Sequence, residues 1–373
     1  MSFFSHETAI VETDKIGDGT KIWAFSHISP GSSIGDNCTI GEGVHIGPNV
    51  IIGNNVKIQN HSLIYEGVTI ENNVFIPPSS SSSKEKTYVM KIANSSEDFK
   101  VLEMQNNALR FIASQDEKIE VPLPIESNQK KDITIIEDPS GKYHARLLTY
   151  IEGDFLKDVE PDNQMLFSVG QFLGRIDQIL TGFNHRSAAR TFIWDAAQVN
   201  VLSHQINQSE DDRLLIEFFI KTYKENVFYH IDELSKGIIH NDGNDHNVII
   251  GSNGKIKGII DFGDMVFSLQ ALEPAVCMAY IAMNNRKSFE LIASLLKGYC
   301  SAKTLSDKDL CSVVYLMCLR MCVTINMSVY RKKLFPNNDY ISISEDSARN
   351  FLNNMTNDSI HKWSGDLCEY VKS

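Results

Sequence analysis

Hydrophobic residues follow two different periods along the chain, and the change between them falls near residue 80. Up to residue 76, isoleucine recurs at every sixth position, twelve times in all, at positions 10, 16, 22, 28, 34, 40, 46, 52, 58, 64, 70 and 76. A period of six fits neither the 3.6-residue period of a helix nor the two-residue period of a strand. It predicts a chain wound as a triangular coil, in which each hexapeptide forms one side and the isoleucine points inward.

Glycine directly follows the isoleucine in five of these hexapeptides, at Gly17, Gly35, Gly41, Gly47 and Gly53. Because glycine adopts positive φ values at little steric cost, we expect these glycines to form the tight corners between sides. Two prolines and five serines follow the last hexapeptide, at residues 77–83, and are typical of a linker. We therefore place a coil of a little under four turns at residues 1–77 and a linker at 78–87.

The pattern beyond the linker is typical of a mixed α+β domain. Residues 88–92 are mostly apolar, with the β-branched residues that strands favour, and predict a strand. The hydrophobic residues of 95–113 recur with a helical period and predict a helix. Beyond residue 161 the period is mostly helical, except around residues 237–264, where two short apolar runs flank a polar loop. We divide this part at residue 153, into a small lobe at 88–153 and a mainly helical lobe at 154–373.

Charge and composition narrow the range of partners. The formal net charge is −12, and lysine and arginine are scattered along the chain. A nucleic-acid partner would need a basic face, so we expect none, whereas an acidic chain suits an amine-bearing substrate. We find no signal peptide and no apolar run of about 18 residues, so no membrane span is expected. The seven cysteines fit buried thiols in a reducing cytoplasm.

The polar loop at residues 240–247 carries the strongest chemical signal. It contains His240, Asp242 and Asn247 in the pattern H-x-D-x-x-x-x-N, and Asp261 follows fourteen residues after the asparagine, at the end of an apolar run. Phosphoryl transfer needs a carboxylate to orient a hydroxyl and accept its proton, and oxygen ligands to hold Mg²⁺ on the phosphates. We therefore assign Asp242 as the base, Asn247 and Asp261 as Mg²⁺ ligands, and His240 as a brace for the loop.

These residues resemble the aminoglycoside phosphotransferase and choline kinase superfamily, and the words around residues 240–247 and 260–266 look most like its hydroxylysine kinase branch. The resemblance implies an α+β, protein-kinase-like fold with a helical C-terminal lobe. It also implies transfer of the γ-phosphoryl group of ATP or GTP to the hydroxyl of an amine-bearing metabolite, with a hydroxylysine-like amino acid favoured. The best-known member of that branch uses GTP.

Further positions match the superfamily pattern. Lys91 corresponds to the strand lysine that contacts the nucleotide phosphates, and Glu103 to its helix partner. The backbone at Thr149, Tyr150 and Ile151 would face the purine in the hinge between the lobes.

The word Phe192-Ile193-Trp194-Asp195 also matches this branch. Trp194 and Asp195 are therefore candidates to face the acceptor, with Asp195 binding its ammonium group. A helix cap and a core tryptophan explain the same two residues equally well.

The coil resembles the left-handed parallel β-helix of hexapeptide-repeat N-acetyltransferases that act on nucleotide sugars, through residues 21–28 and 40–76. That resemblance implies a homotrimer and raises a second function, acetylation of an amino sugar nucleotide. His27, His45 and His61 would be its candidate bases, although surface histidines of a coil fit them as well. The coil has fewer turns than such enzymes carry.

One departure from the kinase pattern bears on activity. Members of the superfamily begin with two strands and a loop that covers the phosphates, but only about ten residues separate the coil from the strand at residue 88. The N-terminal lobe is therefore expected to be truncated. This leaves a third hypothesis open, an inactive kinase-like binding protein carried on a β-helix scaffold.

Overall fold

The computed structural model describes residues 3–60, 62–66, 68–70, 75–76, 87–94, 97–138, 141–204, 209–284, 288–334 and 343–373. The chain divides into two compact units, Met1–Phe99 with Pro122–Tyr150, and Lys100–Val121 with Ile151–Ser373. This division does not follow the lobe boundary expected at residue 153, because the helix after residue 99 belongs to the C-terminal unit. The linker expected at 78–87 lies outside the described residues except for Thr87.

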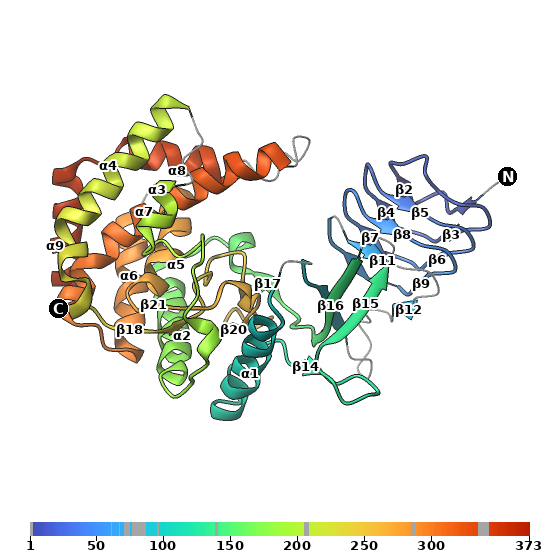
Figure 1. Ribbon diagram of the computed structural model, residues 1–373, viewed down its shortest axis with the longest axis horizontal. Coiled ribbons are helices and arrows are strands. Elements are labelled where there is room, and N and C mark those ends of the chain that lie inside the picture. Colours follow the sequence, from blue (N-terminus) through green and yellow to red (C-terminus); the bar gives the residue numbers. More distant parts are fainter. Residues whose placement is uncertain are drawn as a thin grey trace. The chain divides into compact units, whose positions relative to one another are not determined.

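The N-terminal segment is a parallel β-coil of two-residue strands, seen as stacked turns in Figure 1. Its strands form three sheets, ordered β1-β3-β6-β9-β12, β2-β4-β7-β10 and β5-β8-β11. The strands are β1 (Phe4–Ser5), β2 (Ile10–Val11), β3 (Lys21–Ile22), β4 (His27–Ile28), β5 (Ser33–Ile34), β6 (Thr39–Ile40), β7 (His45–Ile46), β8 (Ile51–Ile52), β9 (Lys57–Ile58), β10 (Leu63–Ile64), β11 (Thr69–Ile70) and β12 (Phe75–Ile76).

The repeating isoleucines form the core of the coil, as the six-residue period predicts. Ile22 pairs with Ile40, and Ile40 with Ile58, so identical side chains stack one turn apart and are fully buried. The first position of the series is an exception. Ile10 pairs with His27 on the outer surface and is 57% exposed, while Val11 takes the inward position opposite Ile28. This first turn is one residue shorter than those that follow.

The glycines after isoleucine have a different role from the one expected. A Cβ on Gly17 would lie 2.4 Å from the backbone of Gly35, and one on Gly35 would lie 2.7 Å from that of Gly53. These positions therefore need glycine because successive turns approach closely. The positive φ values at the corners occur elsewhere in the hexapeptide, for example at Gly43 (φ 64°) and Asn55 (φ 57°).

An antiparallel sheet completes the first unit. Its order is β13-β16-β14, with β15 also paired to β16. Residues 77–86, between β12 and β13, lie outside the described residues, so the truncation expected for the N-terminal lobe stays a prediction. The strands are β13 (Tyr88–Ile92), β14 (Pro124–Ile125), β15 (Thr134–Asp138) and β16 (Gly141–Thr149).

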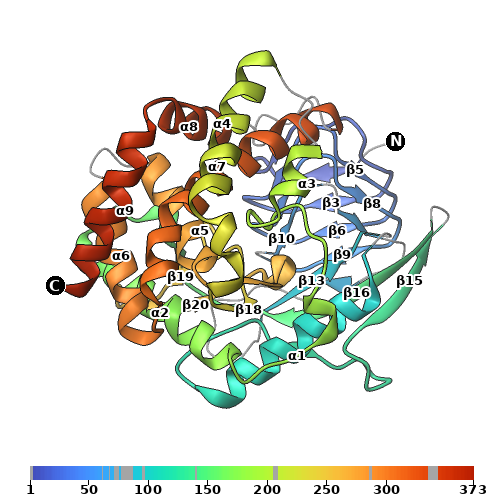
Figure 2. The same cartoon turned by 60° about the vertical axis from the view of Figure 1, so that its left-hand side comes forward.

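The second unit is mainly helical, with short strands on which the polar loop is built (Figure 2). β17 and β20 flank β19, and β18 pairs with β21. Its elements are α1 (Phe99–Gln115), β17 (Asp154–Phe155), η1 (Leu156–Asp158), α2 (Asn163–Leu180), η2 (Arg186–Ala188), α3 (Val199–His204), α4 (Glu210–Asn226), η3 (Phe228–Glu233), β18 (Lys236–Ile239), β19 (Val248–Ile250), β20 (Ile256–Ile259), η4 (Phe262–Asp264), β21 (Val266–Leu269), α5 (Leu272–Asn284), α6 (Ser288–Ala302), α7 (Asp307–Leu334), α8 (Ile343–Asn353) and α9 (Asn357–Lys372).

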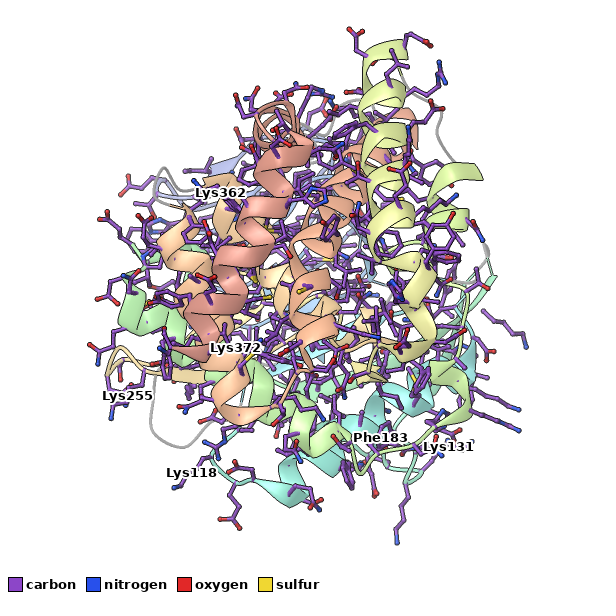
Figure 3. The ribbon with its side chains drawn as sticks, turned by 90° about the vertical axis from the view of Figure 1, so that its left-hand side faces the viewer. Lys118, Lys131, Phe183, Lys255, Lys362 and Lys372 are labelled. Carbon is purple, nitrogen blue, oxygen red and sulfur yellow. The ribbon has the colours of Figure 1, made fainter. Side chains whose placement is uncertain are left out.

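Helix α7 is the centre of this unit and packs against α4, α5, α8 and α9. Over Asp307–Tyr330 it is long and apolar enough to cross a membrane, but 94% of its apolar window is buried inside the structure, as in the core helix of a folded protein. The sequence analysis expected no unbroken apolar run of about 18 residues, and Arg320 does interrupt this one. Helix α9 covers one side of α7, with Lys362 and Lys372 exposed and Leu367 buried (Figure 3).

Candidate active site

The polar loop connects two buried strands of the second unit. β18 leads into it and β19 leaves it, and residues 238–239 and 248–250 on either side are buried. Asn241 turns the chain with a φ of 64°, a left-handed conformation that asparagine tolerates better than most residues. Its main-chain N–H donates to Glu273 Oε2 at 2.7 Å, at the start of α5. The loop is therefore anchored to a buried helix at the residue that precedes Asp242.

His240 ties the loop to the segment that follows β20 and carries Asp261. Its Nδ1 accepts from the Asp242 N–H at 3.2 Å, so its Nε2 carries the proton and donates to the Ile260 carbonyl at 3.0 Å. The Ile260 N–H in turn donates to the Asn247 carbonyl at 3.0 Å. The imidazole is buried and packs edge-on against Phe262, so these contacts hold the loop against the segment after β20.

Three donors hold the carboxylate of Asp242. Oδ1 accepts from Asn244 Nδ2 at 2.7 Å and from Arg320 at 2.8 Å, and Oδ2 accepts from Asn247 Nδ2 at 2.7 Å. The side chain keeps 20% of its surface exposed, so solvent and a small acceptor can reach it. A carboxylate fixed in this way, with an open side, fits the general base of a phosphoryl transfer.

Burial and neighbouring negative charges raise the pKa of the Asp242 carboxyl. Desolvation, together with the charges of Asp264 and Asp261, raises the pKa of Asp242 to about 8, although Arg320 and Asn247 favour its ionised form. With that pKa the carboxyl is mostly protonated at neutral pH, so nearby positive charge, which favours the ionised form, is needed before it can accept a proton from a hydroxyl. Glu273 is buried as well, and desolvation raises its pKa to about 7.

Asn247 and Asp261 offer hard oxygen atoms of the kind that Mg²⁺ prefers. The Asn247 amide nitrogen donates to the main-chain oxygen of Asp242 at 2.8 Å and to its carboxylate at 2.7 Å, which leaves Oδ1 as the ligand atom. Asp261 is exposed and adopts a left-handed conformation with φ 62°, and its Oδ1 accepts from the Gly263 N–H at 3.3 Å. The residues present therefore fit a hydrated divalent cation shared with phosphates.

The sequence analysis missed Arg320, Asn244 and a role for Glu273. Asn244 lies within the recognised loop, but its contact with Asp242 depends on how the loop folds back on itself. Glu273 and Arg320 lie 31 and 78 residues beyond Asp242 (273 − 242 and 320 − 242), on helices that local spacing cannot place. One signal in the sequence could have drawn attention to Arg320, namely an arginine inside an apolar helix. A guanidinium buried in such a helix requires a hydrogen-bond acceptor elsewhere in the fold.

Trp194 and Asp195 lie near the loop but not as substrate contacts of the kind expected. Asp195 is 4% exposed, and its oxygens accept from the Ala197 N–H, the Gln198 amide and the Ser268 hydroxyl at 2.8–3.0 Å. This carboxylate closes a turn and has little room for an ammonium group. The half-buried Trp194 ring lies 4.9 Å from the Arg320 guanidinium, so this residue remains a neighbour of the base.

The expected nucleotide contacts are spread over both units. Lys91 lies on β13 in the first unit and Glu103 on α1 in the second, so their ion pair stays a prediction. In the hinge, the N–H of Thr149 donates to the Leu123 carbonyl at 2.9 Å and that of Tyr150 to Thr87 at 3.1 Å. These two N–H groups are already used, so the purine contact expected at residues 149–151 stays a prediction for their carbonyl groups and for the N–H of Ile151.

The histidines of the coil lie on its surface. His27 and His45 face outward on β4 and β7 with ring centroids 5.1 Å apart, and His27 Nε2 lies 2.7 Å from Glu12 Oε2. Partial burial and the neighbouring His27 lower the pKa of His45. His61 lies outside the described residues.

Comparison with known proteins agrees with this geometry. The hydroxylysine kinase of Mus musculus is 28% identical over 281 residues, which cover 69% of this chain and 73% of the mouse protein. The solved structure of an amicoumacin kinase in complex with AMP-PNP, Ca²⁺ and its substrate shares the fold, with a TM-score of 0.58 at 16% identity, over 74% of this chain and 84% of that one.

Two families match separate parts of the chain. The bacterial transferase hexapeptide repeat matches residues 15–48. Over 35 residues, the chain is 66% identical to a dTDP-3-amino-3,6-dideoxy-α-D-galactopyranose 3-N-acetyltransferase of Aneurinibacillus thermoaerophilus, a match that covers 9% of this chain and 18% of that enzyme. The phosphotransferase enzyme family matches residues 79–307, more than half of the chain and including the whole polar loop with Asp261. The chain belongs to the phosphotransferase enzyme family and is a small-molecule kinase that transfers a phosphoryl group from a nucleotide to a hydroxyl.

Proposed function

We propose that this kinase phosphorylates the side-chain hydroxyl of an amine-bearing metabolite, with a hydroxylysine-like amino acid as the favoured acceptor and ATP or GTP as the donor. The proposal depends on the geometry around Asp242. Its carboxylate accepts three hydrogen bonds, which fix its orientation, while part of the side chain stays exposed. In the reaction, the acceptor oxygen forms a bond to the γ-phosphorus while its proton passes to Asp242. The bond to the nucleoside diphosphate breaks at the same centre.

The charges around the base support an amine-bearing acceptor. Asp261 and Asp264 lie close enough to Asp242 to raise its pKa, so three carboxyl groups share one region of the second unit. Arg320 offsets part of this negative charge, through its ion pair with Asp242 and its electrostatic interaction with Asp264. A cationic acceptor would be attracted to such a region, while an anionic one would be repelled. The mouse relative, named a hydroxylysine kinase, acts on a substrate of this type.

Mg²⁺ would be held by Asn247 Oδ1 and the Asp261 carboxylate. When bound there, it would neutralise charge on the phosphates of the nucleotide. The amicoumacin kinase structure contains AMP-PNP together with a divalent cation, Ca²⁺, which supports a cation-dependent nucleotide site.

A screen for the acceptor and the donor tests the proposal. Release of nucleoside diphosphate is measured with ATP and GTP in parallel, in Mg²⁺, against hydroxylated amines and amino acids that include 5-hydroxylysine. We expect hydroxylysine to be turned over, and lysine, which lacks the hydroxyl, to give no acceptor-dependent signal. Turnover with neutral sugars alone would contradict the amine preference.

The truncated N-terminal lobe supports one alternative, a binding protein without turnover. Only about ten residues separate the coil from β13, which is too few for the two strands and loop that cover the phosphates in the superfamily. Under this alternative, calorimetry would detect nucleotide binding while every acceptor in the screen gave no product. Any acceptor-dependent product excludes it.

We also propose that the coil assembles the chain into a homotrimer, with no role in acetyl transfer. The outer face of β2, β4, β7 and β10 carries the exposed side chains of Ile10 and Leu63 beside the stacked His27 and His45. Apolar groups that remain exposed on a rigid face favour association. Light scattering on the full chain should give a mass of three protomers, and a monomer would contradict the proposal. Binding of acetyl-CoA would favour the acetyltransferase alternative instead.

A further inference from the structure

Arg320 is buried in the middle of α7, and its burial needs a physical reason. The side chain is 1% exposed and is the largest of the fully buried side chains. Transferring a guanidinium group from water to a protein interior is costly unless acceptors and charges compensate it. Such a residue is retained where its charge or its hydrogen bonds are used.

Its partners all belong to the neighbourhood of Asp242. One terminal nitrogen donates to Asp242 Oδ1 at 2.8 Å, and the other donates to the main-chain oxygen of Trp194 at 3.0 Å. The guanidinium lies 4.9 Å from the centroid of the Trp194 ring and 6.0 Å from that of Tyr280, within the range of cation–π contacts. The arginine is therefore fixed from several sides before it reaches the carboxylate.

The two oxygens of Asp242 are not equivalent. Among the residues that the structure describes, Oδ1 accepts from both Arg320 and Asn244, while Oδ2 accepts from Asn247 alone. A carboxylate oxygen has two lone-pair directions in its plane, so Oδ1 is saturated and Oδ2 retains one. The acceptor's proton then has a single in-plane position to enter.

We propose that Arg320 is a positioning residue that orients the Asp242 carboxylate and makes Oδ2 the atom that takes the acceptor's proton. The proposal rests on the base assigned to Asp242 in the proposed function. Arg320 itself touches neither substrate nor nucleotide. Through its second hydrogen bond it also holds the Trp194 segment in register with the base.

The test compares turnover and binding in matched variants of the full chain. The measured rate is that of acceptor-dependent phosphoryl transfer to 5-hydroxylysine. If 5-hydroxylysine is not turned over, the measured rate is that of the slow hydrolysis of the nucleotide by water. Arg320→Met keeps much of the volume and removes the charge and both hydrogen bonds. We expect kcat to fall about 100-fold, as for a misplaced base, with KM for acceptor and nucleotide nearly unchanged. Met321→Leu, a volume-conserving change at the buried apolar residue next to Arg320 on α7, should keep the normal kcat.

Two further measurements separate positioning from a merely structural role. In an Asp242→Asn background, Arg320→Met should cause no additional loss, because both changes remove the same oriented base. Low concentrations of guanidinium should restore turnover to Arg320→Ala, which leaves a cavity, but not to Arg320→Met, which fills it. This rescue keeps the proposal testable if Arg320→Met folds poorly.

Several outcomes would overturn the proposal. A normal kcat in Arg320→Met would overturn it. So would a loss in the double variant equal to the sum of the losses caused by Arg320→Met and Asp242→Asn. An Arg320→Ala enzyme that guanidinium does not rescue would also overturn it. If Asp242→Asn itself kept normal turnover, the base assignment would fail and this inference with it. Loss of activity in Asp242→Asn together with normal turnover in Arg320→Met would overturn the role of Arg320 alone.

Discussion

Replacing Gly170 by alanine should destabilise the second unit, although alanine is the better helix former. Gly170 lies on α2 where the helix meets α6, and a Cβ there would lie 1.8 Å from the Leu295 carbonyl oxygen and 2.7 Å from the Tyr299 nitrogen. The atoms in the way are backbone and cannot rotate aside. Overpacking of this kind costs about 3 kcal/mol, and the helix propensity of alanine offsets roughly 1 kcal/mol. The net loss should be about 2 kcal/mol.

Gly365 on α9 is the matched control, since it is also a helical glycine but has no atom within 4 Å of the added Cβ. There alanine should stabilise by about 0.5–1 kcal/mol. Urea unfolding followed by circular dichroism, and thermal unfolding, should show opposite signs, with Tm lowered by about 4–8 °C for Gly170→Ala. Equal stability of the two variants would refute the close helix contact. So would a Gly170→Ala protein more stable than the native chain.

Three further predictions concern the coil, the pH dependence of stability and the loop brace. Ile52→Ala should lower the free energy of unfolding of the coil by about 2–5 kcal/mol, because Ile52 is buried. Ile51 points outward and is 53% exposed, so Ile51→Ala should lower it by well under half as much. Equal losses in the two variants would contradict the inward register of Ile52. Burial raises the pKa of the Glu273 carboxyl to about 7. Above pH 4.5 the unfolded chain releases this proton while the folded chain still holds it. The free energy of unfolding should therefore fall as the pH rises from about 5 to 7. Glu273→Gln should flatten that fall in a series of thermal melts, and an unchanged slope would refute the cause. His240→Phe, which keeps a ring against Phe262 but loses both hydrogen bonds, should lower kcat by at least roughly tenfold in the acceptor assay; normal kcat would contradict the bracing role.

The parts of the site that the sequence predicts are those encoded within one short segment. His240, Asp242 and Asn247 fall within eight consecutive residues, so their spacing alone indicates the chemistry. Ile260, next to Asp261 at the end of β20, joins them to that residue. Arg320 could not be placed in this way. Its contact with Asp242 is produced by the packing of α7 against the loop, and nothing in the period of α7 indicates which buried acceptor the arginine would meet.

The coil shows the same division between local and long-range information. The six-residue period identifies the inward isoleucines because every turn repeats the same geometry. It does not reveal that the first turn is one residue shorter, which moves Ile10 to the surface and Val11 inward. Nor does it distinguish a glycine needed for a positive φ from one needed for close approach, as at Gly17, since that depends on the neighbouring turn.

The most direct test of the kinase assignment compares the native chain with Asp242→Asn in one acceptor-dependent assay. Mass spectrometry follows the phosphorylated acceptor in the presence of nucleotide and Mg²⁺, with Lys255→Ala, an exposed turn residue, as the control. Removal of a general base predicts a loss of about 10²–10⁴-fold in Asp242→Asn, and normal product in Lys255→Ala. Equal product formation by the native chain and a folded Asp242→Asn protein would contradict the assignment of Asp242 as the base.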